Sequence, residues 1–136
     1  MAIATVSSPG SLRAEEDFTV TKARTESELG KTSKEVSTAC GAAVKSSVDW
    51  TTMTESVVEG YSVSSYCGNP LEALVDLCKG AAAKKFIKKK VKALVCTFGG
   101  KDKRDLTVEG GTITFTVDFD SGNNEEYARR ELIKKL

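Results

Sequence analysis

Histidine is absent from this chain of 136 residues. Its absence removes the side chain that most often serves as a general base or a metal ligand, so Ser-His-Asp, Cys-His and histidine-containing metal sites are excluded. No G-x-G-x-x-G or G-x-x-x-x-G-K-[ST] pattern for phosphate binding occurs either. We therefore predict a protein that is not an enzyme and that binds no cofactor and no metal.

Long apolar runs are also lacking. No stretch approaches the ~20 apolar residues that a membrane-spanning helix needs, and the first residues, Met1 to Thr5, lack the basic and apolar regions of a signal peptide. The chain is then either cytoplasmic or the remainder of an exported protein whose signal was removed. The net charge is only +1, which does not favour nucleic acid as a partner.

Cysteine is scarce, with four residues, an even number, and no two of them have the C-x-x-C spacing. A zinc site would consist of four isolated thiolates, which is not the usual spacing. Two disulfides in an exported domain, secreted or periplasmic, are the favoured interpretation; buried free thiols in a cytoplasmic protein are the alternative. The disulfide candidates are Cys40, Cys67, Cys78 and Cys96.

The firmest structural prediction is a β-hairpin around Gly110-Gly111. Two glycines between runs of β-branched residues favour a two-residue turn with positive φ. Pairing outward from the turn sets Glu109 opposite Thr112 and collects the apolar residues on one face, namely Leu106, Val108, Ile113, Phe115, Val117 and Phe119. The other face carries Asp105, Thr107, Glu109, Thr112, Thr114, Thr116 and Asp118, and can meet water.

A strand at 91–98, joined by a short loop, predicts a three-strand antiparallel meander with this hairpin. Alternation over 44–50 predicts a fourth strand. The fold class that we predict is therefore α+β, with a four-stranded, mainly antiparallel sheet and helices packed on one face. Residues 1–24 are predicted to be a flexible leader, with a brief option of an edge strand at Phe18 and Val20, and residues 25–136 to be a single domain.

Helices are predicted from caps and spacing. Capping boxes at Thr25 and Thr32 predict that a helix begins at one of them, and Gly41 is placed to end it. Asn69-Pro70 predicts the start of another helix, a further helix covers 81–89, and a last helix follows Asn123 and lies across the apolar sheet face. Residues 51–67 are predicted to be mostly loop.

The helix after Asn69 constrains the disulfides. At ~1.5 Å per residue it separates Cys67 from Cys78 by more than the ~4.4–6.8 Å between Cα atoms that a bridge needs. Because Cys78 and Cys96 are both predicted to face the core, we favour the pairs Cys78–Cys96 and Cys40–Cys67.

Carboxylates near 118–126 and one cysteine are the remaining candidates for chemistry. An acid/base pair or a Ca²⁺ site is the alternative for Asp118, Asp120, Glu125 and Glu126, but their spacing is not that of an EF-hand, and we interpret them as turn and helix-start residues. Cys67 precedes a helix and would be the best placed reactive thiol, unless it forms a disulfide.

One dense run of lysines is the clearest charged feature. Without arginine it is interpreted as a solvated helix face, with Phe86 and Ile87 as core anchors; binding to a polyanion, either nucleic acid or an anionic membrane, is the alternative function. Its members are Lys84, Lys85, Lys88, Lys89, Lys90 and Lys92.

No known family is suggested by these residues. The function that we predict is a small, non-catalytic, exported domain with disulfides, which binds a protein or a surface ligand as an inhibitor or accessory module. The sequence does not indicate an oligomeric state.

Overall fold

The predicted hairpin forms one edge of the sheet in a computed structural model that describes residues 9–136. Strands β3 (Asp105–Glu109) and β4 (Thr112–Val117) pair antiparallel, with Glu109 opposite Thr112 and Leu106 opposite Phe115. Both turn glycines have positive φ, 58° at Gly110 and 84° at Gly111, as a tight hairpin turn requires. The predicted turn, register and apolar face are confirmed.

The antiparallel meander is wrong, because β4 lies between β3 and the preceding strand. Strand β2 (Ala93–Phe98) pairs parallel with β4, and β1 (Lys45–Val48) pairs parallel with β2, so the order is β1-β2-β4-β3. The sheet is therefore mixed and mostly parallel, although the α+β class and the four strands are confirmed. The loop after β2 carries the chain past one strand position to the sheet edge, and β4 returns into the space left between.

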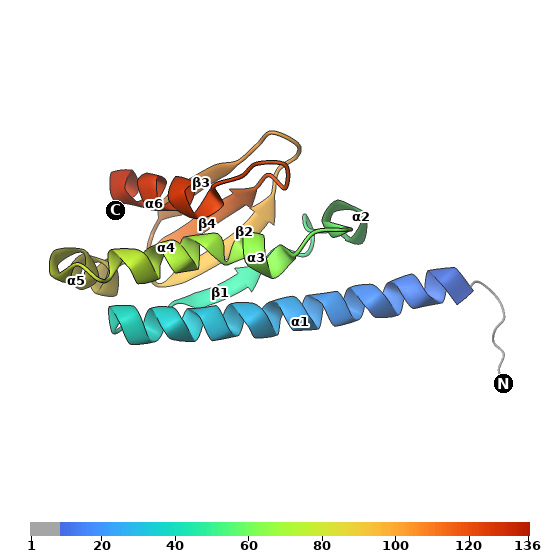
Figure 1. Ribbon diagram of the computed structural model, residues 1–136, viewed down its shortest axis with the longest axis horizontal. Helices are drawn as coiled ribbons and strands as arrows, with labels where there is room; N and C mark the ends of the chain where they lie inside the picture. Colours follow the sequence, from blue (N-terminus) through green and yellow to red (C-terminus); the bar gives the residue numbers. More distant parts are fainter. Residues whose placement is uncertain (1–8) are drawn as a thin grey trace.

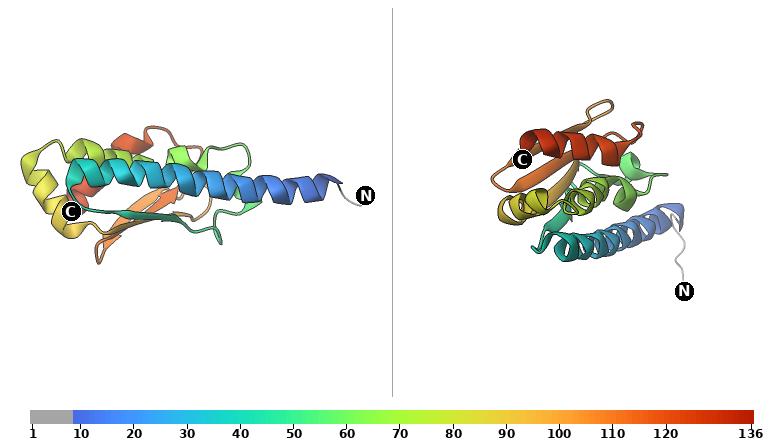
Figure 2. Two further views of the ribbon diagram at one scale, coloured as in Figure 1. Left: turned by 90° about the horizontal axis from the view of Figure 1, so that it is seen from below. Right: turned by 60° about the vertical axis from the view of Figure 1, so that its left-hand side comes forward.

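Three helices lie side by side on one face of the sheet (Figures 1 and 2). They are α1 (Pro9–Cys40), α4 (Asn69–Leu77) and α6 (Asn124–Lys135). Helix α5 (Ala81–Lys90) stands at the end of this layer, and the short helices α2 (Glu55–Val58) and α3 (Val63–Cys67) occupy part of the segment predicted to be loop.

Helix α1 is longer than the capping boxes predict. It passes through Thr25 and Thr32 without a break and ends at Cys40, where Gly41 has a φ of 75° and donates its N–H to Ser37 O. Residues 9–24 of the predicted leader are therefore helical, while its residues 1–8 lie outside the described part of the chain. The first turns of α1 project beyond the sheet (Figure 1).

The core lies between the sheet and this helix layer. Leu106, Ile113, Phe115 and Val117 point from the sheet to fully buried positions. From the helices, the buried side chains include Leu29, Val36, Leu71, Leu74, Ala128 and Leu132. None of the helices in the described residues is long and apolar enough to cross a membrane.

Two disulfides are present, as predicted, but the predicted connectivity is wrong. Cys40 bonds Cys78 and Cys67 bonds Cys96, with Cα separations of 5.3 and 5.6 Å. Cys67 and Cys78 do not pair, which agrees with the length argument. The same length explains the error: α4 carries Cys78 away from Cys96 to the C-terminal end of α1, while Cys67 at the start of the helical segment stays above β2.

Candidate functional site

The lysine run divides into two groups according to what its side chains touch. All six lysines, on α5 and just before β2, are exposed. Lys84 and Lys88 lie over the end of α1, where a Cβ on Gly41 would be 3.9 Å from Lys84 Cε and 3.7 Å from Lys88 Cδ. The last carbonyl groups of a helix carry a partial negative charge, so the positive charges of these two lysines stabilise the C-terminal end of α1.

The other group borders a cavity of about 450 Å³ at the end of the helix layer. Lys89, Lys90 and Lys92 line it together with Lys135 from α6. Among the side chains of residues 17–136, the first three form no ion pair within 4 Å, whereas Lys135 pairs with Glu131 at 3.0 Å. We call this cavity the lysine pocket. It combines three lysines that form no ion pair among residues 17–136 with a fourth, Lys135, that is held by Glu131.

An apolar groove of about 200 Å³ adjoins the lysine pocket between α5 and α6. Two of its side chains are exposed: Phe86 at 42% and Ile133 at 63%. Lys90 Nζ lies 5.9 Å from the centroid of the Phe86 ring, which links groove and pocket. We call this the α5–α6 groove; its residues are Leu77, Ala83, Phe86, Ile87, Leu132, Ile133 and Leu136.

The groove was only partly predictable. Ile87 is buried, as a core anchor should be, but Phe86 is not, so that part of the prediction is wrong. Leu132 and Leu136 share a helical stripe, and Ile133 stands one residue outside it. This extra apolar residue next to a filled stripe was the available signal for an exposed apolar surface.

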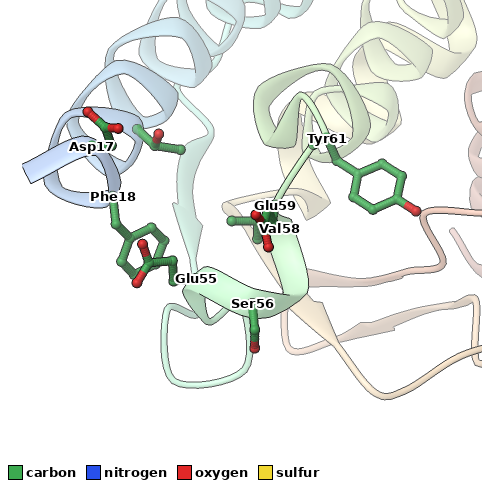
Figure 3. A pocket seen from close by; sticks show the side chains of 9 residues that line it. Asp17, Phe18, Glu55, Ser56, Val58, Glu59 and Tyr61 are labelled. Carbon is green, nitrogen blue, oxygen red and sulfur yellow. The ribbon is translucent and has the colours of Figure 1, made fainter. Parts of the chain in front are cut away.

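A second cavity, of about 560 Å³, lies between the first part of α1 and α2 (Figure 3). Its acidic residues are Asp17, Glu55 and Glu59. Tyr61 points away from Asp17, Phe18 and Glu55 (Figure 3).

The two aromatic residues of this acidic cleft are engaged elsewhere in the fold. Phe18 packs edge-on against Trp50 at 5.9 Å, and Tyr61 stacks on Phe119 at 4.6 Å. The negative charge of Asp120, which accepts a hydrogen bond from the Tyr61 hydroxyl, raises the pKa of Tyr61. The rings therefore belong to the packing of α1 and the sheet end.

The predicted candidates for acid/base chemistry are not brought together as a pair. Asp118 accepts hydrogen bonds from Ser121 Oγ at 2.7 Å and Asp120 N at 3.3 Å, and the bond from Ser121 lowers the pKa of Asp118. Asp118 thus closes the turn before α6. Nowhere in the described residues do three or more Cys, Asp or Glu side chains form a group that could hold a metal ion.

Glu72 on α4 and Glu125 on α6 form a pair of carboxyl groups. Partial desolvation of the Glu72 carboxyl group, together with its hydrogen bond to Glu125, raises the pKa of Glu72. This pair stands in the helix layer away from either cavity. Cys67, the candidate reactive thiol, is in a disulfide and is therefore no nucleophile.

Comparisons with protein-family models, with curated proteins and with solved structures find no match to this chain.

Proposed function

We propose that this chain is a non-catalytic domain of an oxidising, extracytoplasmic compartment that binds another protein through the α5–α6 groove and the lysine pocket. One observation carries the proposal. Phe86 and Ile133, both large and exposed, stand at an apolar groove beside the lysine pocket, three of whose four lysines form no ion pair among residues 17–136. Apolar anchors beside a charged rim are the usual composition of a protein-binding surface.

The chemistry of the surface specifies the partner. A concave apolar groove accepts side chains that protrude at helical spacing, and the neighbouring lysines favour carboxylates on the same segment. The partner is therefore an acidic amphipathic helix. The groove is too short for a long segment, so one turn carrying two or three apolar side chains would fill it.

The compartment follows from the two buried disulfides. Such bonds persist in secreted and periplasmic proteins and are rare in the cytoplasm. The lack of catalytic chemistry is supported by the absence of histidine and by the structural engagement of Asp118 and Cys67.

The test is a binding titration with a defined probe. We choose a fluorescent helical peptide of ~18 residues with leucines on one face and glutamates on the other. Phe86→Ser and Ile133→Ser should each weaken binding by about tenfold or more. The matched control is Val20→Ser, because Val20 is a comparably exposed apolar residue at 51% on α1, far from the groove. Equal binding by all four proteins would refute the proposal.

A second candidate function is polyanion binding by the lysine run, which the exposure of all six lysines favours. Lys85, Lys89, Lys90 and Lys92 are the residues to replace with serine, because Lys84 and Lys88 also support the end of α1. Retention on heparin that these replacements abolish, together with unchanged binding after Phe86→Ser, would favour this candidate. No retention at ~50 mM salt would end it.

A further inference from the structure

The face of the sheet opposite the helices is open. Helices α1, α4 and α6 all pack on one side, and in the described residues no helix covers the other (Figure 2). Three of the four strands, β1, β2 and β4, are parallel to one another. Parallel sheets are nearly always covered on both faces, whereas an open face is common only for antiparallel sheets. A mostly parallel sheet with one bare face therefore lacks a layer.

The bare face is uncharged at its centre. Its two central strands present only small side chains, all half-buried, and the two outer strands present the charged ones. From β2 and β4 come Ala93, Val95, Thr97, Thr112, Thr114 and Thr116; from β1 and β3 come Lys45, Ser47, Asp105, Thr107 and Glu109.

One end of this face is already occupied by the chain itself. Thr97 Oγ1 lies 2.9 Å from Thr52 Oγ1, in the loop after β1. Thr116 lies against the loop after β2, where a Cβ added to Gly99 would be 3.1 Å from Thr116 Cγ2. The free surface is thus the other end of the face. It contains two rows of residues aligned across the four strands, one that begins at Lys45 and one that begins at Ser47.

The strand register places opposite charges in one of these rows. Lys45 aligns with Ala93, Ala93 with Thr112, and Thr112 with Glu109. Lys45 and Glu109 therefore stand at the two edges of the sheet, three strand spacings or ~14 Å apart, which is too far for a direct ion pair. Both side chains are exposed, and neither forms an ion pair within residues 17–136.

We propose that a second copy of this chain covers the bare face, with a two-fold axis parallel to the strands between β2 and β4. This rotation exchanges the two edges without moving a residue along the strand direction. It sets β1 over the partner's β3 and Lys45 over the partner's Glu109, and the symmetry makes the same contact twice. At the centre, Val95 and Thr114 of one copy meet Thr114 and Val95 of the other.

The size of the face sets the strength of the dimer. The two free rows span about three residues along each of four strands ~4.8 Å apart, which gives a footprint of roughly 200 Å², well below the ~800 Å² per partner of a standard stable interface. We therefore expect a weak dimer, with a dissociation constant on the order of 1 mM. This surface lies on the opposite side of the sheet from the helix layer that holds the α5–α6 groove, so the inference does not depend on the proposed function.

The test is sedimentation velocity up to ~1 mM protein, with charge reversals. Lys45→Glu or Glu109→Lys alone sets like charges against each other twice and should raise the dissociation constant by about tenfold or more. Mixing the two single variants restores both opposite-charge contacts, so a heterodimer should form with at least the affinity of the unmodified dimer. The double variant K45E/E109K should also dimerise.

A central substitution supplies a second, steric test. Thr114→Arg places a long cation in the middle of the interface and should leave a monomer, whereas Thr114→Val, the control of similar size, should dimerise at least as well. Circular dichroism confirms that both variants are folded. A monomer at ~1 mM would overturn the proposal, and so would a dimer that survives Thr114→Arg or a mixture of the charge variants that fails to associate.

Discussion

Removal of the Cys40–Cys78 disulfide should cost a large part of the folding free energy. This bond closes a loop of 38 residues. In the chain-entropy relation, opening such a loop in the unfolded state lowers stability by about 3.9 kcal/mol at 25 °C. Because ordinary domains have only ~5–15 kcal/mol of stability, the variant C40A/C78A should fold marginally, with the end of α1 released from the segment after α4.

The assay is equilibrium unfolding in guanidinium chloride, followed by circular dichroism. The matched control is C67A/C96A, whose loop of 29 residues gives a loss of about 3.6 kcal/mol. Both cysteine pairs are buried, so the two variants should differ by less than ~1 kcal/mol. A loss below ~1.5 kcal/mol for C40A/C78A would refute the loop argument, because the native contacts around Cys40 would then hold α1 without the bond.

Three further predictions concern charge and backbone. Glu72 has a raised pKa beside Glu125, so its contribution to stability is present at low pH and is lost as pH rises through the folded-state value; Glu72→Gln should raise Tm at pH 7 and leave it nearly unchanged at pH 4. Asp118 has a lowered pKa, so its contribution is present above the unfolded value and is lost as the pH falls; Asp118→Asn should lower Tm at pH 7, and a constant difference down to pH 2 would contradict this. Gly111 has a φ of 84°, and a Cβ there would lie 2.9 Å from a backbone oxygen; Gly60 has a similar φ of 81° but open space around it. Gly111→Ala should therefore lower the free energy of unfolding by about 2 kcal/mol or more. Gly60→Ala, the control, should lower it by about 1 kcal/mol.

Local turn chemistry was predictable, and strand adjacency was not. Gly110-Gly111 determines both the hairpin and its register, because only one register puts the apolar residues of both strands on the same face. The position of β2 in the sheet depends on which strand it pairs with. The short loop after β2 is compatible with pairing to β3 or to β4, so the sequence does not decide between them. The charges of Asp105 and Glu109 were the usable sign that β3 is an edge strand.

Helix lengths and cysteine partners depend on tertiary packing in a similar way. Thr25 fits a capping box, but it lies inside α1 and is buried against the fold, so packing overrides the local signal. Asn69 is the first residue of α4 and not its cap, a position held by Gly68. The candidate binding surface was predictable only in its lysines, because the exposure of Phe86 and Ile133 results from how α5 meets α6.

The two disulfide loops overlap along the sequence, and this overlap would hold the chain together after cleavage by a protease. Residues 67–78 belong to both covalent loops. A cut at any peptide bond between Cys40 and Cys96 leaves two fragments that are still joined by at least one sulfur bridge, and a cut between Cys67 and Cys78 leaves two such joins. A nicked molecule would therefore keep its fragments in register until a reductant separates them.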